Sequence, residues 1–337
     1  MNRFLPLLAI TLLLGCTQKP RPNLSFYHWK QSYQPSALEE DYLDSVKCRK
    51  LYMRFFDVDF PPEKATPQPL SMLEIKTDTR GREVIPCVYI TNRTFTRMGK
   101  AQVSQLARRT HTLIQGMAKR NHLEEIRQVQ IDCDWSSSTR KKYFRFLEEL
   151  KTHFGNQVSL SATIRLHQVK YREKTGVPPV DHGVLMLYNM GNIMDPKEAN
   201  SILQLPLVKQ YISPDTPDYP LQLDLALPTY TWVLVYRFQK LVRIIHPGDE
   251  EQLINSSKVE SLPAHQFEVR ENFYYGNTYL YRGDRLRFES ISPGELRNTL
   301  DYLEEKTFLQ PREIIFYHLD SINLKRYDAT FYQNLCS

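Results

Sequence analysis

The amino-acid sequence predicts an α/β fold: a (β/α)8 TIM-like barrel with partly degenerate helices and a small β insertion after the seventh strand. Three observations lead to this prediction. Eight short apolar runs rich in β-forming residues recur along the chain, helix-like intervals separate several of them, and most of the runs end in polar or aromatic residues. Alternating strands and helices build a parallel sheet, and eight such strands are the number that closes a barrel.

The predicted strands are bounded by turn and loop residues. In chain order they are 24–30 (LSFYHWK), 50–57 (KLYMRFFD), 84–94 (VIPCVYITNRT), 129–135 (VQIDCDW), 158–167 (VSLSATIRLH), 183–190 (GVLMLYNM), 221–232 (LQLDLALPTYTW) and 313–320 (EIIFYHLD). Their near-continuous apolar character is typical of strands that are buried on both faces of a barrel wall.

Helix patterns fill several of the intervals. Ser36 and Glu39 form a capping box, and apolar stripes with a 3.6-residue period run through 103–117 and 143–154. Two further starts are predicted at 195–198 (DPKE) and 292–295 (SPGE), where an N-cap residue precedes Pro and Glu stands at the third helical position. Two intervals, the Pro-rich 60–78 and the loop-like 168–181, predict short or missing helices.

The predicted organisation has one folded domain. The barrel occupies 24–325, and a β-rich insertion at 233–290 carries hairpin signals around 274–277 (YYGN) and 282–284 (RGD). Residues 326–337 form a C-terminal tail.

The amino terminus predicts export and lipid attachment. Arg3 precedes an apolar run at 4–14 that is too short to span a bilayer but has the length of a secretory h-region. Residues 13–16 (LLGC) resemble the bacterial lipobox, so 1–15 are a predicted signal peptide, Cys16 is the predicted lipid-bearing residue and 16–23 form a tether. We expect a protein anchored to a membrane of the bacterial cell envelope, with its folded domain in the periplasm or at the cell surface. Ordinary secretion with an incidental cysteine is the alternative.

Composition excludes several other classes. The net charge of +6 is spread along predicted helix faces, which argues against nucleic acid as a partner. The cysteines lack the close spacing of a disulfide framework, and Cys87 and Cys133 fall in apolar strands where buried free thiols are expected. The nine histidines show no metal-ligand spacing, so neither a metal nor another cofactor is expected.

Two carboxylate side chains lie on the predicted fourth strand. Residues two apart in a strand share a face, so Asp132 and Asp134 point the same way, roughly 7 Å apart, into the mouth of the barrel. Burial and mutual repulsion are expected to raise the pKa of one of them. Such a pair suits acid–base work, although it could equally satisfy polar partners in the barrel interior.

Other strand ends add candidates, because active sites of this fold lie at the carboxyl ends of the strands. Asp57 and Asp320 are candidate catalytic carboxylates. The candidate substrate-binding residues are His28, Trp29, Asn92, Arg165, His167, Tyr188, Asn189, Tyr230, Trp232 and His318. Each histidine could instead be a hydrogen-bonded structural residue, and the aromatic side chains serve core packing as well as sugar stacking.

The fourth strand also carries a family resemblance. Residues 131–135 (IDCDW) resemble the strand-four motif D-G-x-D-x-D-W-E of chitinase-type glycoside hydrolases (family 18), and Tyr188-Asn189 resembles their strand-six tyrosine. The wider pattern FYHW, QIDCDWSSSTRKKYFRFLEEL and MLYNMG resembles a family of bacterial envelope proteins of uncharacterised activity with glycosidase-like barrels. The resemblance implies a carbohydrate partner and a glycosidase-like fold.

One departure from the motif matters for activity. Ser136 occupies the position of the general-acid glutamate, and Val129-Gln130 replace the leading Asp-Gly. A serine hydroxyl cannot supply the proton that glycoside cleavage needs. Two hypotheses follow. The chain is a glycoside hydrolase-like barrel acting on a polysaccharide or envelope glycan, with Asp132, Asp134 and either Asp320 or Asp57 as its carboxylates, or it is a non-catalytic lipoprotein that binds a glycan or a partner.

Overall fold

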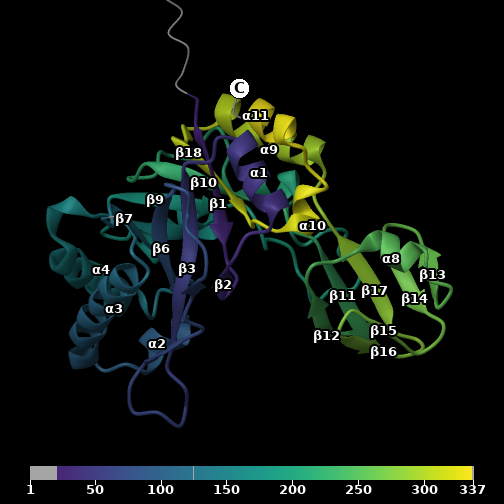
Figure 1. Ribbon diagram of the computed structural model, residues 1–337, viewed down its shortest axis with the longest axis horizontal. Helices are drawn as coiled ribbons and strands as arrows, with labels where there is room; N and C mark the ends of the chain where they lie inside the picture. Colours follow the sequence, from purple (N-terminus) through teal and green to yellow (C-terminus); the bar gives the residue numbers. More distant parts are fainter. Residues whose placement is uncertain (1–20, 124, 336–337) are drawn as a thin grey trace, which may run out of the picture.

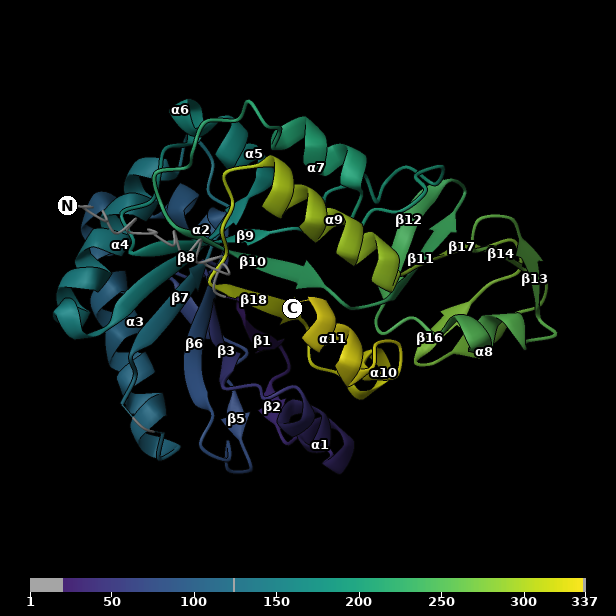
Figure 2. The same ribbon diagram turned by 90° about the horizontal axis from the view of Figure 1, so that it is seen from above.

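Eight parallel strands close into a barrel in the computed structural model, which describes residues 21–123 and 125–335 (Figures 1 and 2). β1 pairs with both β18 and β3, so the sheet has no open gap. The predicted (β/α)8 fold class is confirmed. In chain order the barrel strands are β1 (Asn23–His28), β3 (Lys50–Asp59), β6 (Glu83–Ile90), β7 (Gln128–Asp132), β8 (Ser159–Arg165), β9 (His182–Met186), β10 (Leu223–Pro228) and β18 (Glu313–Tyr317).

All eight predicted strands are present, and burial explains their apolar sequences. Every residue of β7, β9 and β10 is buried, because these strands face the barrel interior on one side and helices on the other. Packing is tight enough to demand glycine at one point. A Cβ on Gly183 would lie 2.6 Å from Leu223 Cδ2 and 2.9 Å from Ile164 Cγ1.

Helices cover the outside of the barrel (Figure 2). The capping boxes predicted at Ser36 and Ser292 are present, with each serine side chain accepting a hydrogen bond from the backbone N–H of Glu39 or Glu295. The longer helices are α1 (Ala37–Ser45), α3 (Lys100–Arg120), α4 (Arg140–Phe154), α7 (Leu205–Tyr211), α9 (Pro293–Lys306) and α11 (Ala329–Leu335). The shorter ones are α2 (Asn92–Arg97), η1 (Gly155–Gln157), α5 (Leu166–Lys170), α6 (Arg172–Thr175) and α10 (Ser321–Leu324).

The two irregular crossovers also follow the sequence. Between β3 and β6 the chain forms only β4 (Gln68–Leu70) and β5 (Glu74–Ile75), the latter paired with β2 (Ser32–Tyr33). Between β8 and β9 it forms only the short α5 and α6.

The prediction of a helix that starts at Asp195 is wrong. Residues 195–198 make turns, in which the Asp195 carboxylate accepts a hydrogen bond from the Lys197 N–H. The Asp195 carbonyl oxygen accepts from the N–H of Glu198 and from Arg287 Nη1, a residue of the insertion. A long-range contact therefore determines this segment, and the next helix, α7, begins at Leu205.

The insertion after the seventh barrel strand is a small antiparallel module beside the barrel (Figures 1 and 2). Its five-stranded sheet has the order β12-β11-β17-β14-β13, and it has its own core around Val233, Phe267 and Leu286. Its elements are β11 (Trp232–Arg237), β12 (Lys240–Ile245), α8 (Glu250–Ile254), β13 (Val259–Leu262), β14 (Gln266–Val269), β15 (Phe273–Tyr275), β16 (Thr278–Leu280) and β17 (Arg285–Glu289).

A buried carboxylate joins the insertion to the barrel side. Glu289 accepts hydrogen bonds from the Ser201 N–H at 2.9 Å, from Ser201 Oγ at 2.7 Å and from Trp232 Nε1 at 2.7 Å. Arg287 Nε donates to its other oxygen at 2.6 Å. Two of these charge-assisted bonds, both from Ser201, connect the insertion to the segment between β9 and α7.

The predicted signal peptide and Cys16 lie outside the described residues. Within residues 21–123 and 125–335, none of the helices combines the length and the apolar character needed to cross a bilayer.

Candidate functional site

Asp132 is the last residue of β7 and lies at the carboxyl end of the barrel. Its side chain is buried, and Thr163 Oγ1 on the neighbouring strand β8 donates to Asp132 Oδ1 at 2.7 Å. Burial, followed by the negative charge of Asp134, raises the pKa of Asp132 to about 6. The expected rise in the pKa of one member of the pair is therefore found, and it falls on the buried member.

Asp134 has different surroundings. The strand ends at Asp132, so the alternation of faces expected through residue 136 is not continued. The side chain of Asp134 is 49% exposed and forms a two-point ion pair with Arg165, whose Nε and Nη2 lie 2.6 and 3.0 Å from its two oxygens. Arg165, at the end of β8, thereby holds Asp134 at the rim of the barrel.

Ser136 lies in the turn that leads into α4. Its Oγ is 2.9 Å from Ser138 Oγ and 3.2 Å from Thr139 Oγ1, and its N–H donates to Thr139 Oγ1 at 2.9 Å. The position that the chitinase motif gives to the general acid is thus part of a hydroxyl cluster at a helix start.

The two other candidate carboxylates are ion-paired. Arg54 Nε donates to Asp57 Oδ1 at 2.6 Å, and a second Arg54 nitrogen contacts Asp57 Oδ2. Lys30 Nζ lies 3.0 Å from Asp320 Oδ2. Burial opposes ionisation of Asp320, but the hydrogen bond from the Ile322 N–H and the charge of Lys30 lower its pKa. Of the four candidate carboxylates, Asp132 is the one without a cation among its described contacts.

A group of aromatic rings covers one side of the mouth. Tyr317, at the end of β18, stacks on Tyr188 with 5.2 Å between ring centroids, and its ring also contacts Trp29 at 5.8 Å and Tyr230 at 5.6 Å. Trp29 and Tyr317 are partly exposed, whereas Tyr188 and Tyr230 are buried. Tyr230 Oη donates to Asn189 Oδ1 at 2.5 Å. Sequence reasoning missed Tyr317, although its position at the end of the eighth strand could have identified it.

Several predicted binding residues have structural contacts. Trp232 is buried and bonded to Glu289, so it packs at the base of the insertion. His28 Nε2 is 3.1 Å from the Ser32 carbonyl oxygen, and burial lowers its pKa to about 4. His318 Nδ1 is 3.1 Å from the Leu319 carbonyl oxygen. Asn92 Oδ1 accepts a bond from Thr139 Oγ1 at 2.6 Å.

Two shallow hollows flank the Asp134–Arg165 pair. One of about 110 Å³ is lined by residues that include Arg165, His167, Tyr188 and Asn189. The other, of about 420 Å³, is lined by residues that include Asp134, Ser136 and His167. His167 lines both hollows, and the partial burial of its ring lowers its pKa. These hollows bring five of the predicted site residues together at the rim of the barrel: Asp134, Arg165, His167, Tyr188 and Asn189.

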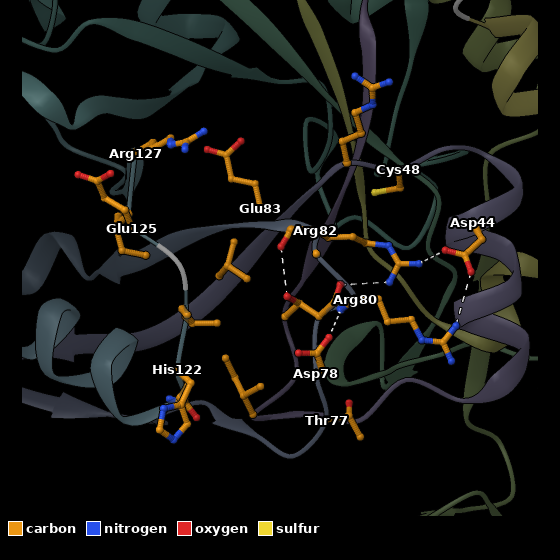
Figure 3. A pocket seen from close by; sticks show the side chains of 18 residues that line it. Asp44, Cys48, Thr77, Asp78, Arg80, Arg82, Glu83, His122, Glu125 and Arg127 are labelled. Atoms are coloured by element: carbon orange, nitrogen blue, oxygen red, sulfur yellow. Dashed lines mark hydrogen bonds and ion pairs between the residues drawn. The ribbon is translucent and has the colours of Figure 1, made fainter.

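A larger hollow of about 660 Å³ lies at the opposite end of the barrel, where the helix between β3 and β6 is missing (Figure 3). Its buried Arg82 contacts Glu40 and Asp44, and Arg80 lies 3.5 Å from the second Asp44 oxygen. None of the predicted site residues lines it. Since the active sites of this fold lie at the other end of the strands, we do not assign the chemistry to this hollow.

The described residues contain no group of three or more His, Cys, Asp or Glu side chains placed to hold a metal ion. Cys48, Cys87 and Cys133 are buried free thiols, as expected for the latter two.

Comparison with known proteins identifies the fold. No family model and no curated protein matches the chain. Among solved structures it is similar to the spore cortex-lytic enzyme SleL of Bacillus megaterium, at 12% identity and a TM-score of 0.55, covering 95% of this chain and 74% of that one. It is also similar to a chitinase from Chromobacterium violaceum, at 10% identity and a TM-score of 0.51, covering 92% and 97%.

A third similar structure is a mutant class V chitinase from Nicotiana tobaccum in complex with NAG4, at 13% identity and a TM-score of 0.51, covering 95% and 99%. At these identities the similarity establishes the fold. The resemblance predicted from the fourth strand is thus confirmed at this level, and the chain has a glycoside hydrolase-like TIM barrel.

Proposed function

We propose that this protein is a lipid-anchored glycan-binding barrel that holds a carbohydrate at the mouth without hydrolysing it. The single observation that carries the proposal is Ser136, which stands in place of the general acid and is bonded to Ser138 and Thr139. Glycoside cleavage needs a carboxylic acid beside the glycosidic oxygen, and a serine hydroxyl does not release its proton in the working pH range.

The neighbouring carboxylates do not replace that acid. Asp57, Asp134 and Asp320 each have a cation at ion-pair distance: Arg54, Arg165 and Lys30, respectively. Moving any of these carboxylates toward a substrate would leave a partly buried cation unpaired.

The aromatic rings favour a carbohydrate as the ligand. Trp29 and Tyr317 are partly exposed, and Tyr317 stacks on Tyr188, which lines the same hollow as Asn189 and Arg165. Sugars have apolar ring faces and polar edges, so a wall of aromatic rings next to hydrogen-bonding groups suits them. The NAG4 complex of the tobacco chitinase supports the same class of ligand.

The anchor is proposed from the sequence around Cys16. Six residues lie between Cys16 and Asn23, and the seven steps from one to the other reach at most about 25 Å when fully extended. Asn23 begins β1 at the amino ends of the barrel strands, opposite the mouth. The mouth would therefore open away from the lipid surface. Incorporation of labelled fatty acid into the wild type but not into Cys16→Ala tests this part of the proposal.

A glycan-array screen of the mature protein tests binding. We expect binding that Trp29→Ala weakens and that Phe238→Ala, an equally aromatic change on the exposed β11–β12 turn, leaves unchanged. Equal binding by both variants, or no binding to any glycan, would contradict the proposal.

Hydrolysis is a second candidate function, and the raised pKa of Asp132 is the observation that favours it. A carboxyl group that titrates near pH 6 is protonated in part of the population at mildly acidic pH and could act as an acid. Turnover of any glycan by the wild type, together with its loss in Asp132→Asn, would establish the enzyme and overturn the binding-only proposal.

A further inference from the structure

We propose that the insertion carries a second glycan-contact surface, formed by Tyr274, Tyr279 and Tyr281 and called here the tyrosine strip. The inference rests on the proposed glycan-binding function and extends it from the barrel mouth to a polymer that also contacts the insertion.

The hairpin of β15 and β16 places the three rings in one row. Tyr274 and Tyr279 are cross-strand partners, and Tyr281 follows Tyr279 by two residues, which puts it on the same side. The ring centroids of Tyr274 and Tyr279, and those of Tyr279 and Tyr281, are each 4.9 Å apart. The other side of the hairpin carries Tyr275 and Leu280, both buried in the core of the insertion.

The three rings of the strip are exposed to solvent. The exposed fractions of Tyr274, Tyr279 and Tyr281 are 68%, 39% and 47%. No hydrogen bond to their hydroxyl groups occurs within the described part of the chain, so each ring keeps a free polar group. Single exposed apolar residues are ordinary, but a contiguous group of aromatic side chains on one face indicates a binding surface.

One end of the strip is held rigidly. The guanidinium carbon of Arg237 lies 4.2 Å from the centroid of the Tyr281 ring. Arg237 in turn makes a two-point ion pair with the buried Asp284, at 2.8 and 2.9 Å, and Asp284 also accepts a bond from the Tyr281 N–H. A ring that is already fixed loses little conformational entropy when a ligand stacks on it.

The composition of the strip favours a glycan over a protein partner. Its rings are all tyrosine, and the aliphatic residue of the hairpin, Leu280, points into the core. Neighbouring rings are inclined by 63° and 87°, so ring faces and hydroxyl-bearing edges alternate along the row. A chain of pyranose rings offers the matching alternation of apolar faces and hydroxyl groups.

The position of the strip agrees with this ligand. In Figure 1 the β15–β16 hairpin lies on the lower side of the molecule, the side toward which the barrel strands point their carboxyl ends. The start of β1, where the predicted tether joins the fold, lies at the upper side. A polymer that reaches the mouth from the side away from the anchor therefore also meets the insertion.

The test compares long and short glycans on the full-length mature protein. The probes are chitin particles, peptidoglycan sacculi and the tetramer of N-acetylglucosamine. The double variant Tyr274→Ala/Tyr279→Ala removes two rings, Tyr274→Phe/Tyr279→Phe keeps the rings without their hydroxyls, and Phe238→Ala is the matched control because Phe238 is 91% exposed on another turn of the insertion. Thermal unfolding verifies that every variant is folded.

We expect the alanine variant to bind at least one of the two particles roughly tenfold more weakly than the wild type. Its affinity for the tetramer should be unchanged, the phenylalanine variant should lie in between, and the Phe238 control should match the wild type. Particle binding that is lost in the alanine variant, without any tetramer binding by the wild type, supports the strip and refutes the barrel mouth. Particle binding that survives in the alanine variant, or that is absent from the wild type, overturns the inference.

Discussion

The substitution Asp132→Asn should stabilise the protein at neutral pH. The carboxyl group of Asp132 is buried, and burial together with the charge of Asp134 raises its pKa from 3.8 to about 6 on folding, although the charge of Arg165 opposes the rise. A raised folded-state pKa means that this group contributes most to stability below pH 3.8, and that the contribution is lost as the pH rises through 6. The shift corresponds to about 3 kcal/mol, the cost of holding the ionised carboxylate in the barrel at pH 7.5.

Asparagine removes that cost and keeps an oxygen to accept the Thr163 bond. The gain in unfolding free energy should therefore be about 2.4 kcal/mol larger at pH 7.5 than at pH 4, where the native carboxyl group is protonated and the unfolded one is partly ionised. The comparison between the two pH values cancels any packing difference between the carboxyl and the amide.

Urea unfolding followed by tryptophan fluorescence at both pH values measures this difference. Asp134→Asn is the matched control, because Asp134 is half-exposed and paired with Arg165. Its loss should lower stability at pH 7.5 by about 1 kcal/mol or less. If Asp132→Asn loses the same amount of stability at pH 4 and at pH 7.5, the reasoning is refuted, because the buried ionised carboxylate then does not destabilise the native protein.

Three further predictions concern the core and the insertion. Glu289→Gln should destabilise the protein by about 3 to 5 kcal/mol, because Arg287 loses its buried partner. Glu268→Gln in the same sheet is the more exposed control, and equal losses of stability in chemical unfolding would contradict this reasoning. Gly183→Ala should lower the free energy of unfolding by about 1 to 3 kcal/mol, because the added methyl group overlaps Leu223. Gly294→Ala, with open space around it, should leave stability unchanged. An unchanged stability of Gly183→Ala would show that the barrel wall can adjust. The thiols of Cys48, Cys87 and Cys133 should react with a thiol reagent at pH 8 only after unfolding, because they are buried and burial raises the pKa of each. Rapid labelling of any of the three in the native protein would contradict this expectation.

The strands and most helices could be predicted because their determinants are local. The apolar runs that became β7, β9 and β10 are continuous in sequence, and the capping boxes at Ser36 and Ser292 need only residues three apart. The capping pattern at Asp195 did not lead to a helix. Its carbonyl oxygen instead accepts a hydrogen bond from Arg287 of the insertion, 92 positions away.

Part of the site could also be predicted, because position at the end of a strand can be read from the local sequence. Position at a strand end suffices to place Asp132, Tyr188 and Arg165 at the mouth. It does not distinguish a free carboxylate from a paired one, because the pairs join distant segments: Lys30 with Asp320, or Arg165 with Asp134.

By itself, the sequence determined the barrel class, the apolar segment before Cys16 and the serine at the general-acid position, since each is written in consecutive residues. The tertiary structure decided which charges neutralise one another, that Trp232 is buried and bonded to Glu289 of the insertion, and that three tyrosines of one hairpin share an exposed face. Those outcomes depend on burial and on contacts across the sheet, which arise only when segments far apart in the chain are brought together.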